Sequence, residues 1–461
     1  MKKLYPLTAA QNMHYQWIRQ YNTQQVSGVS IVAALKLDLD FELLNKCIDE
    51  ETRRYRCLNL RFTEPDEKGE IRQYFKRKIQ KHIKILNMSD MSFEEAESIM
   101  QTMAYETFEG DDIPMYQFLL VKLPEGFNGF FVHLDHRLVD SCAIAVMVKD
   151  IMMLYAHYKY DREYPEALAD FEQVLVKDLE KAGNEKRLSK DRDYWESQLD
   201  KLGEPLYSDI QGKTVLEASR KAHGNQTLRC ADIETGNLFV AVKDYCLEKE
   251  PTSRLLEYCN QRHISFNNLM LLAMRTYLSK VNEGQEDITI ESFIARRSTH
   301  EEWTSGGSRT IMFPCRTVIG PEKSFFEAAH EVQNVQNCNY LHSSYDPELI
   351  RKSLQKRYGT PEGTTYESCY LTYQPLIVDS GNLDLAGIPL YFKWFANGAA
   401  TKKVYLTITH TPEGGLNFSY HYQTASLTEK DIELFYYYMM KIVFMGIEKD
   451  DISIGEIIRN V

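Results

Sequence analysis

Three histidines in this chain are each followed four residues later by an aspartate, a spacing that could bring a base and an acid together: His136, His157 and His342. Only His136 lies between two apolar runs, "FFVHLD" and "CAIAVMV", which predict a strand and a buried helix. We expect the side chains of the other two to be solvated, because His157 lies near a helix end and His342 lies in the polar stretch "LHSSYD". Imidazole has a pKa of about 6.5, so His136 is the candidate base. The alternative is a histidine in a turn, with Asp140 as a helix cap.

The two aspartates near this histidine have different expected roles. Asp140 begins the predicted buried helix, where a carboxylate needs a cationic or hydrogen-bonding partner. Asp135 precedes His136 on the strand, and successive strand residues point to opposite faces, so we expect it to face away. Cys142 is close in sequence, but at a helix start it is more simply a small apolar residue than a nucleophile. No Gly-x-Ser-x-Gly nucleophile elbow occurs.

Strands and helices must position these residues, and the chain mixes both without strict β-α-β alternation. "GVSIVAALKLDLD" predicts a strand, and "DFELLNKCIDEETRRY" predicts a helix capped by Asp40. "MYQFLLVKL" and "GFFVHLD" flank the turn "PEGFNG" and predict a hairpin that ends at His136. Later, "SFNNLMLLAMRTYLSKV" predicts a buried helix and "KKVYLTITHTPEGGLNFSYHY" a second hairpin. A mixed α/β fold follows.

Length and composition limit the possible classes of protein. A chain of 461 residues favours two lobes, and the charge-dense stretch between residues 170 and 201 places their boundary, giving 1–175 and 176–461. A net charge of −12 argues against a nucleic-acid surface and gives no attraction to anionic membranes. Neither a signal peptide nor an apolar membrane-spanning run occurs, and the nine cysteines form no C-x-x-C pair. We expect a cytoplasmic protein with reduced thiols and no metal.

Ordered segments along nearly the whole chain resemble the condensation domains of nonribosomal peptide synthetases, within the superfamily of chloramphenicol-acetyltransferase-like acyltransferases. "YPLTAAQNMHY" resembles the opening Pro-Leu-Thr-x-x-Gln segment, and "RYRCLNLRF" resembles Arg-His-x-x-Leu-Arg-Thr-x-Phe. "DHRLVDS" resembles the signature His-His-x-x-x-Asp-Gly. "DYWESQL" and "GGSRTIMFPCR" are similar to the helix that begins the second lobe and to the Gly-x-Phe-x-Asn-x-x-Pro-x-Arg region.

The resemblance assigns roles to three residues. His136 takes the place of the functional second histidine of the signature. Asp140 takes the place of the aspartate that is structural in the family and is held there by an arginine. We expect Arg54, the first residue of "RYRCLNLRF", to be that arginine.

The chain also departs from the family pattern. Asp135 replaces the first histidine of the signature and Ser141 its glycine, while Tyr55 and Asn59 replace a histidine and an arginine of the second element. The serine adds a side chain close to where the thioester carbonyl is expected. These departures motivate an alternative, a catalytically degenerate protein that binds a carrier or serves as a scaffold.

The resemblance implies two lobes in a V-shaped pseudo-dimer with a tunnel between them. It also implies an acyltransferase that condenses a thioester-bound acyl or aminoacyl donor with an amine to form an amide. His136 would be the general base, or would orient the amine, since a neutral amine is already nucleophilic. The alternative within the same chemistry is a coenzyme A-dependent O-acyltransferase that forms an ester.

The donor is expected to reach the protein in trans. The chain shows no adenylation domain and no carrier segment, so we expect a freestanding monomer without a covalently bound cofactor. The donor would be the phosphopantetheine thioester of an acyl or peptidyl carrier protein, or of coenzyme A, and the acceptor a small amine or alcohol. A basic run could dock an acidic carrier or be a solvated helix face; its residues are Lys186, Arg187, Lys190 and Arg192.

Overall fold

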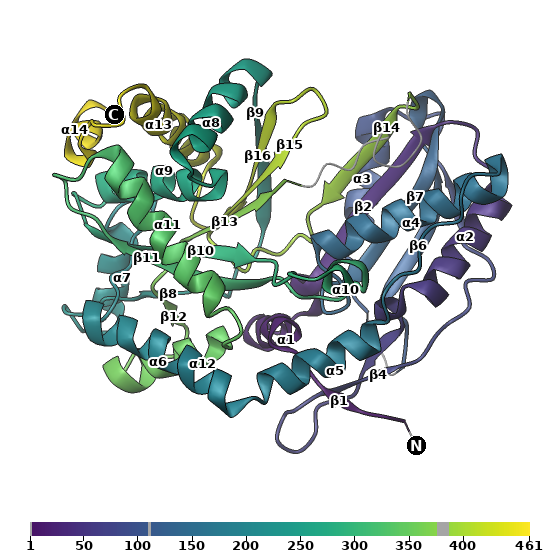
Figure 1. Ribbon diagram of the computed structural model, residues 1–461, viewed down its shortest axis with the longest axis horizontal. Coiled ribbons are helices and arrows are strands. Elements are labelled where there is room, and N and C mark those ends of the chain that lie inside the picture. Colours follow the sequence, from purple (N-terminus) through teal and green to yellow (C-terminus); the bar gives the residue numbers. More distant parts are fainter. Residues whose placement is uncertain (1, 109–111, 376–386) are drawn as a thin grey trace. The chain divides into compact units, whose positions relative to one another are not determined.

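The computed structural model describes residues 2–108, 112–375 and 387–461 (Figure 1). Contacts divide the chain into two compact units. The first contains the described residues of Met1–Gly183, Ala295–Ile311 and Leu376–Ala399; the second contains Asn184–Ile294, Met312–Pro375 and Ala400–Val461. A division into the contiguous ranges 1–175 and 176–461 omits the two later segments that return to the first unit. Sequence patterns show where elements begin, but not where the chain crosses from one unit to the other.

The first unit is built on a five-stranded sheet of order β14-β2-β7-β6-β5 and a small sheet of order β1-β4-β3. Its strands are β1 (Tyr5–Pro6), β2 (Gly28–Lys36), β3 (Leu60–Phe62), β4 (Arg72–Phe75), β5 (Ile85–Asn87), β6 (Tyr116–Lys122), β7 (Phe127–Asp135) and β14 (Leu390–Phe395). Its helices are α1 (Ala9–Tyr21), η1 (Gln24–Ser27), α2 (Phe41–Arg54), η2 (Arg56–Asn59), α3 (Phe93–Met103), η3 (Pro124–Gly126), α4 (Ser141–Tyr160), α5 (Phe171–Ala182) and α10 (His300–Thr304).

Both faces of the five-stranded sheet are buried, which explains the apolar runs of its central strands. On one face, side chains such as Ile31 and Val132 pack with α2 and α4 in the larger core of the unit. On the other face, Val32 and Phe131 pack against α3 around Met100. Consecutive residues of β2 and β7 thus enter different cores, as the alternation of side chains along a strand requires.

The second unit is built on a six-stranded mixed sheet of order β11-β10-β13-β15-β16-β9, beside a two-stranded sheet of β12 and β8. Its strands are β8 (Ala231–Asp232), β9 (Val240–Leu247), β10 (Asp287–Ile294), β11 (Ile311–Val318), β12 (Thr364–Thr365), β13 (Cys369–Gln374), β15 (Val404–His410) and β16 (Leu416–Gln423). Its helices are α6 (Glu185–Leu202), α7 (Thr214–Ala222), α8 (Lys249–Arg262), α9 (Phe266–Val281), α11 (Phe325–Leu341), α12 (Pro347–Tyr358), α13 (Glu429–Glu448) and α14 (Ile454–Asn460).

Helices α8, α9, α11 and α13 lie along one face of this six-stranded sheet (Figure 1). Leu371, Leu406 and Tyr420 point into the core that these helices close. The residues that alternate with them on the opposite face are mostly polar or aromatic and half-buried, as in the sequence "LTITH" of β15. The second unit is therefore a sheet with one face buried by its own helices.

The fold class and the main elements predicted from the sequence are confirmed. The structure is a mixed α/β fold with several mixed sheets. Asp40 caps α2, the hairpin of β6 and β7 ends at Asp135, and the buried run after His136 is helix α4. The second predicted hairpin is formed by β15 and β16.

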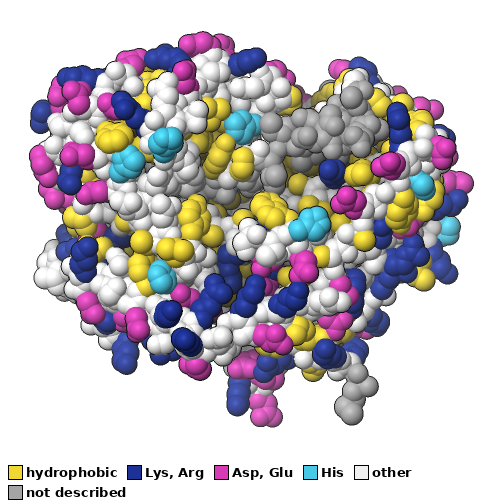
Figure 2. Space-filling model, in the orientation of Figure 1, with side chains coloured by type: hydrophobic (Ala, Val, Ile, Leu, Met, Phe, Trp, Pro, Cys, Tyr) yellow, Lys and Arg dark blue, Asp and Glu magenta, His cyan; other side chains and the backbone are white. Residues whose placement is uncertain are grey.

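The surface carries both signs of charge. Figure 2 shows Lys and Arg side chains interspersed with Asp and Glu over α5 and α6 rather than separated from them. Lys186, Arg187, Lys190 and Arg192 are all exposed on α6. None of the helices in the described residues is sufficiently long and apolar to span a bilayer.

Candidate active site

His136 is the first residue of the turn between β7 and α4. β7 pairs with β2 along its whole length, and the register places Asp135 opposite Gly28. The His136 N–H donates to the Ser27 carbonyl oxygen at 2.6 Å, and the Leu138 N–H donates to the Asp135 carbonyl oxygen at 2.9 Å. These bonds fix the backbone of His136, and its side chain is half-buried.

The imidazole of His136 stacks on the imidazole of His14 in α1. The two ring centroids are 4.2 Å apart and the planes differ by 20°. His14 in turn meets the ring of Trp17 edge-on at 4.9 Å. Gln11 ties α1 to the turn, because its Nε2 donates to the Arg137 carbonyl oxygen at 3.2 Å. Sequence reasoning missed His14 as a neighbour, since helical spacing does not show which turn a helix face meets.

Asp135 forms a buried ion pair within the same turn. Its Oδ1 accepts hydrogen bonds from Ser27 Oγ at 3.1 Å, from the Arg137 N–H at 2.8 Å and from Arg137 Nε at 2.9 Å. Its Oδ2 accepts from Arg137 Nη2 at 2.7 Å. The guanidinium of Arg137 also lies 4.4 Å from the ring centroid of Phe62. The aspartate at the first signature position therefore closes the turn with its own arginine.

Asp140 joins the start of α4 to the segment Ala295–Ile311. It caps the helix, with Oδ1 accepting from the Ala143 N–H at 3.0 Å. Arg297 binds both of its oxygens, with Nη1 at 2.7 Å from Oδ2 and Nη2 at 2.8 Å from Oδ1. The N–H groups of Arg309 and Thr310 donate to Oδ2 at 3.0 Å, and the Thr310 hydroxyl donates at 2.9 Å. Asp140 is 1% exposed, so nearly all of its hydration has been replaced by these donors.

The charge state of Asp140 follows from these contacts. Burial by itself raises the pKa of this carboxyl, but the charge and hydrogen bonds of Arg297, with those of the backbone N–H groups, outweigh burial. The pKa of Asp140 is lowered to about 2. The group is ionised at neutral pH and is too weak a base to take a proton from an amine.

The predicted pairing of Arg54 with Asp140 is wrong. Arg54 ends α2 and binds Asp150 instead, with Nε 2.7 Å from Oδ2 and Nη2 3.0 Å from Oδ1. Its Nη2 also donates to the Glu166 carbonyl oxygen at 2.6 Å. The last turn of α2 lies beside the middle of α4, so Arg54 reaches an acid ten residues beyond Asp140. The partner of Asp140, Arg297, is distant in sequence, and nothing in "SFIARRSTH" identified it.

The side chains at the other positions that depart from the family pattern make structural contacts. The Tyr55 hydroxyl donates to the Ala143 carbonyl oxygen at 3.0 Å, in the first turn of α4. Asn59 Nδ2 donates to the Thr52 carbonyl oxygen at 2.7 Å. Ser141 is the half-buried first residue of α4. Burial raises the pKa of the Cys142 thiol to about 11, which disfavours the thiolate that a nucleophile needs.

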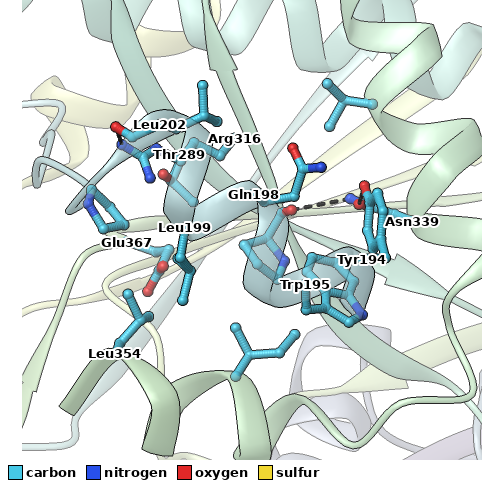
Figure 3. A pocket seen from close by; sticks show the side chains of 14 residues that line it. Tyr194, Trp195, Gln198, Leu199, Leu202, Thr289, Arg316, Asn339, Leu354 and Glu367 are labelled. Atoms are coloured by element: carbon cyan, nitrogen blue, oxygen red, sulfur yellow. Dashed lines mark hydrogen bonds between the residues drawn. The ribbon is translucent and has the colours of Figure 1, made fainter. Parts of the chain in front are cut away.

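A small cavity lies in the second unit (Figure 3). Trp195 and Leu199 of α6 line it, with Asn339 of α11 and the carboxyl of Glu367. Tyr194 donates to Asn339 Oδ1 at 3.1 Å on the cavity wall. Its volume is about 50 Å³, enough for a few water molecules but not for an acyl thioester. None of the predicted site residues lines it.

The other two histidines of the spacing are less exposed than predicted. His342 stacks on Tyr194 with centroids 4.2 Å apart, and its Nδ1 lies 2.9 Å from Asp191 Oδ1. His157 is half-buried, with Nδ1 2.6 Å from the Arg162 carbonyl oxygen. The expectation that both lie in water holds only in part, because each ring is half-buried: His342 packs on residues distant in sequence, and His157 packs on its sequence neighbours as far as Tyr164. Within the described ranges no cluster of three His, Cys, Asp or Glu side chains could hold a metal.

Comparison with known proteins shows the family of this chain. The sequence profile of the condensation domain matches residues 1–457. The chain belongs to the condensation domain family. Surfactin synthase subunit 1 of Bacillus subtilis (strain 168) is 22% identical over 442 residues, which cover 95% of this chain and 11% of that protein. Tyrocidine synthase 3 of Brevibacillus parabrevis is 23% identical over 379 residues, which cover 79% of this chain and 5% of that protein. This condensation domain thus spans a small part of the curated relatives it matches.

Solved structures of condensation domains share the fold. The first condensation domain of the calcium-dependent antibiotic synthetase, in complex with a substrate analogue, aligns with a TM-score of 0.79 at 15% identity, covering 98% of each chain. A mutant of the starter condensation domain of rhizomide synthetase RzmA, in complex with C8-CoA, aligns with a TM-score of 0.80 at 15% identity. The alignment covers 98% of this chain and 97% of that domain. VibH, a condensation enzyme, aligns with a TM-score of 0.73 at 14% identity, and the alignment covers 95% of this chain and 96% of VibH.

Proposed function

We propose that this condensation domain transfers an acyl or aminoacyl group from a phosphopantetheine thioester to an amine and so forms an amide, with His136 as the general base or the group that orients the amine. One observation carries the assignment of the residue. Both aspartates of the motif are held by arginines, Asp135 by Arg137 and Asp140 by Arg297, while the half-buried ring of His136 lies between them on a fixed turn. Proton transfer therefore falls to the imidazole.

The proposed step breaks the C–S bond of the thioester and forms a C–N bond. The amine lone pair attacks the carbonyl carbon, and the nitrogen of the adduct carries an excess proton. His136 accepts that proton, the electron pair of the C–S bond leaves with sulfur, and the thiolate is then protonated. Asp140 does not act on the substrate in this scheme; with Arg297 it holds the first turn of α4 behind His136. The donor is a carrier-bound thioester or an acyl-coenzyme A.

A screen by mass spectrometry tests this proposal. Wild-type protein and the variant His136→Ala are incubated in parallel with coenzyme A thioesters and carrier-bound thioesters, each with amine and alcohol acceptors. We expect amide products from the wild type and a rate lower by about 10²-fold or more in the variant, the usual contribution of a general base. Glu42→Gln, an exposed change on α2, is the matched control and should keep the wild-type rate.

The other outcomes separate the alternatives. Ester products with alcohols would replace the amide assignment by an O-acyltransferase. Amide formation that is equally fast in His136→Ala would remove the role of the imidazole but keep the reaction. If no donor and acceptor pair reacts, while carrier protein still binds, the departures at Asp135 and Ser141 mark a carrier-binding protein without catalysis.

A further inference from the structure

The cavity of about 50 Å³ in the second unit has no part in the proposed condensation (Figure 3). Helices α6, α11 and α12 enclose it together with the strands β10 and β11, and all of its lining residues belong to the second unit. Since one water-sized volume takes about 10–15 Å³, the space holds roughly three to five non-hydrogen atoms. Its size therefore suits a very small molecule.

The walls of the cavity are mainly apolar. Trp195 and Leu199 line it from α6, Ile350 and Leu354 from α12, and Pro314 from β11. Trp195, Leu199 and Ile350 are buried, and Leu354 is half-buried. Carbon atoms that face an empty space lack contacts on that side, so a ligand with carbon atoms of its own gains dispersion contacts with them.

Several polar groups at the cavity already have partners. Trp195 Nε1 donates to the His342 carbonyl oxygen at 3.3 Å. Asn339 Nδ2 donates to the Pro314 carbonyl oxygen at 3.0 Å, and Asn339 Oδ1 accepts from the Tyr194 hydroxyl at 3.1 Å. These groups hold the wall together, and their hydrogen-bonding capacity is largely used within the chain.

Thr289 of β10 differs from these groups. It lines the cavity and is 2% exposed. Its hydroxyl oxygen is buried without a hydrogen-bond partner among the described residues. Such a hydroxyl has lost its bonds to water and has gained none in return. Because a hydroxyl can both donate and accept, a ligand hydroxyl in the cavity would supply the missing bond.

The two charged residues of the wall do not favour a charged ligand. Arg316 uses all three of its side-chain nitrogens, with Nε and Nη2 on Asp287 at 2.8 and 2.7 Å and Nη1 on the Gly203 carbonyl oxygen at 2.6 Å. Glu367 accepts from the Thr365 hydroxyl at 2.7 Å, and burial raises the pKa of its carboxyl, which disfavours the anion. A buried ion without a partner of opposite charge is costly, so a neutral ligand fits best.

Ordered water suits this cavity less well than an organic molecule. A buried water makes about three hydrogen bonds, and a cluster that fills the space would need more polar partners than Thr289, Gln198 and Glu367 provide. A short-chain alcohol needs one partner for its hydroxyl and apolar contact for its carbons. The walls offer both.

We propose that this cavity binds a small neutral alcohol of about two or three carbons, with Thr289 as the hydrogen-bond partner of its hydroxyl and the apolar walls around its carbons. The inference does not rest on the proposed condensation, since none of the residues assigned to that reaction lines the cavity. A ligand of so few atoms binds weakly, with a Kd in the millimolar range.

The test is a titration of the full chain, carrying ¹³C-labelled Ile and Leu methyl groups, with 1-propanol, followed by ¹H–¹³C spectra. We expect saturable shifts of the Ile350, Leu199 and Leu354 methyl signals. Leu349, exposed beside Ile350 on α12, is the matched control and should show only a weak, linear shift. The ions n-propylammonium and propionate carry a charge in place of the hydroxyl, and each should bind at least about tenfold more weakly.

Three variants separate the role of the hydroxyl from that of the space. Thr289→Val keeps the shape of the side chain but removes its hydroxyl, and it should weaken 1-propanol binding by about threefold to tenfold. Thr289→Ser keeps the hydroxyl and should bind within about threefold of wild type. Leu354→Phe adds volume at the wall and should abolish the saturable shifts. Methyl signals elsewhere in the chain report whether each variant is folded.

Each of three results would overturn the proposal. Equal and linear shifts at Leu349 and Ile350 would show a general solvent effect without a site. Binding of 1-propanol that is unchanged in Thr289→Val would remove the hydroxyl as the anchor of the ligand. Tighter binding of n-propylammonium than of 1-propanol would replace the neutral ligand by a cation held by Glu367.

Discussion

At the scale of single residues, the neighbour that matters most to His136 is His14, which no sequence pattern indicated. A ring stacked at 4.2 Å limits the orientations that the imidazole can take. Orientation contributes to a proton transfer because the base must lie within hydrogen-bond reach of the proton it takes. In the proposed reaction, His14 would therefore act through His136, as a positioning residue.

We therefore expect His14→Ala to lower the condensation rate by about threefold to tenfold, less than His136→Ala does. The two changes should not be additive: in a chain that already carries His136→Ala, removing His14 should change the rate by less than about twofold. Rates measured for the four proteins of this cycle check the prediction. A full effect of His14→Ala in the absence of the His136 imidazole would show that His14 acts independently.

The sequence identified the motif residues but not all of their partners. His136 and Asp140 were predicted because a strand, a turn and a helix are local patterns, which the 17 residues from Phe130 to Val146 contain in full. Arg297 was missed because it lies 157 residues after Asp140 in the sequence, beyond several elements of the second unit. Arg54 was wrongly assigned, since its pairing depends on how far along α4 the helix α2 packs.

At the scale of elements, the Asp140 and Arg297 pair joins α4 to the segment 295–311. Both side chains are at most 1% exposed, so removing one partner leaves an uncompensated buried charge. We expect Asp140→Asn and Arg297→Met each to lower the free energy of unfolding by about 3–5 kcal/mol at pH 7, and the double variant to lose less than the sum. Urea unfolding of the four proteins measures this coupling.

The pH dependence of the same pair has a defined sign. The pKa of Asp140 is about 2 in the folded chain, below the unfolded value of about 3.9, so its stabilisation is present above pH 4. It is lost as the pH falls from 4 to 2, and the stabilities of wild type and Asp140→Asn should converge over that range. The pair Arg54 and Asp150, ten residues further along the chain in α4, is the control, and its effects should add to those of the first pair.

The packing of α2 on α4 also buries Glu51, and burial disfavours the ionised form of its carboxyl group. Glu51 is fully buried on α2, and burial together with Asp150 raises its pKa well above the usual value, against the effect of Arg54. A raised carboxyl pKa means that the native state is favoured below the unfolded value of about 4.3 and loses stability as the pH rises. The neutral form of Glu51 is therefore the one that suits the fold.

Replacing Glu51 by the neutral, similarly shaped glutamine should then stabilise the protein at high pH. We expect Glu51→Gln to be more stable than wild type by about 1–2 kcal/mol at pH 8 and by less at pH 5. Glu42→Gln, exposed on the same helix, should shift stability by under about 0.5 kcal/mol at either pH. A loss of stability in Glu51→Gln that does not depend on pH would indicate that the ionised carboxylate is needed.

At the scale of the whole molecule, the first unit is completed by chain that comes much later in the sequence. Residues 1–183 contain His136 and the complete signature, and the sequence favoured a lobe ending near this point. Two parts of that unit are missing from them, however. β14 pairs with β2 from Leu390 opposite Leu35 to Phe395 opposite Ser30, and the segment 295–311 supplies Arg297. Neither could be assigned from periodicity, which describes elements but not the unit they join.

A fragment of residues 1–183 should therefore not fold by itself, although it carries every residue of the signature. Without β14 the backbone of β2 becomes an open edge, and without Arg297 the carboxylate of Asp140 is buried and unpaired, which together cost several kcal/mol of a stability that is typically 5–15 kcal/mol. Near-ultraviolet circular dichroism and urea unfolding are the measurements. The fragment should lack fixed aromatic signals and a cooperative transition, whereas the full chain should show both. A cooperative transition in the fragment would mean that the first 183 residues form a domain, and that the later segments only add to it.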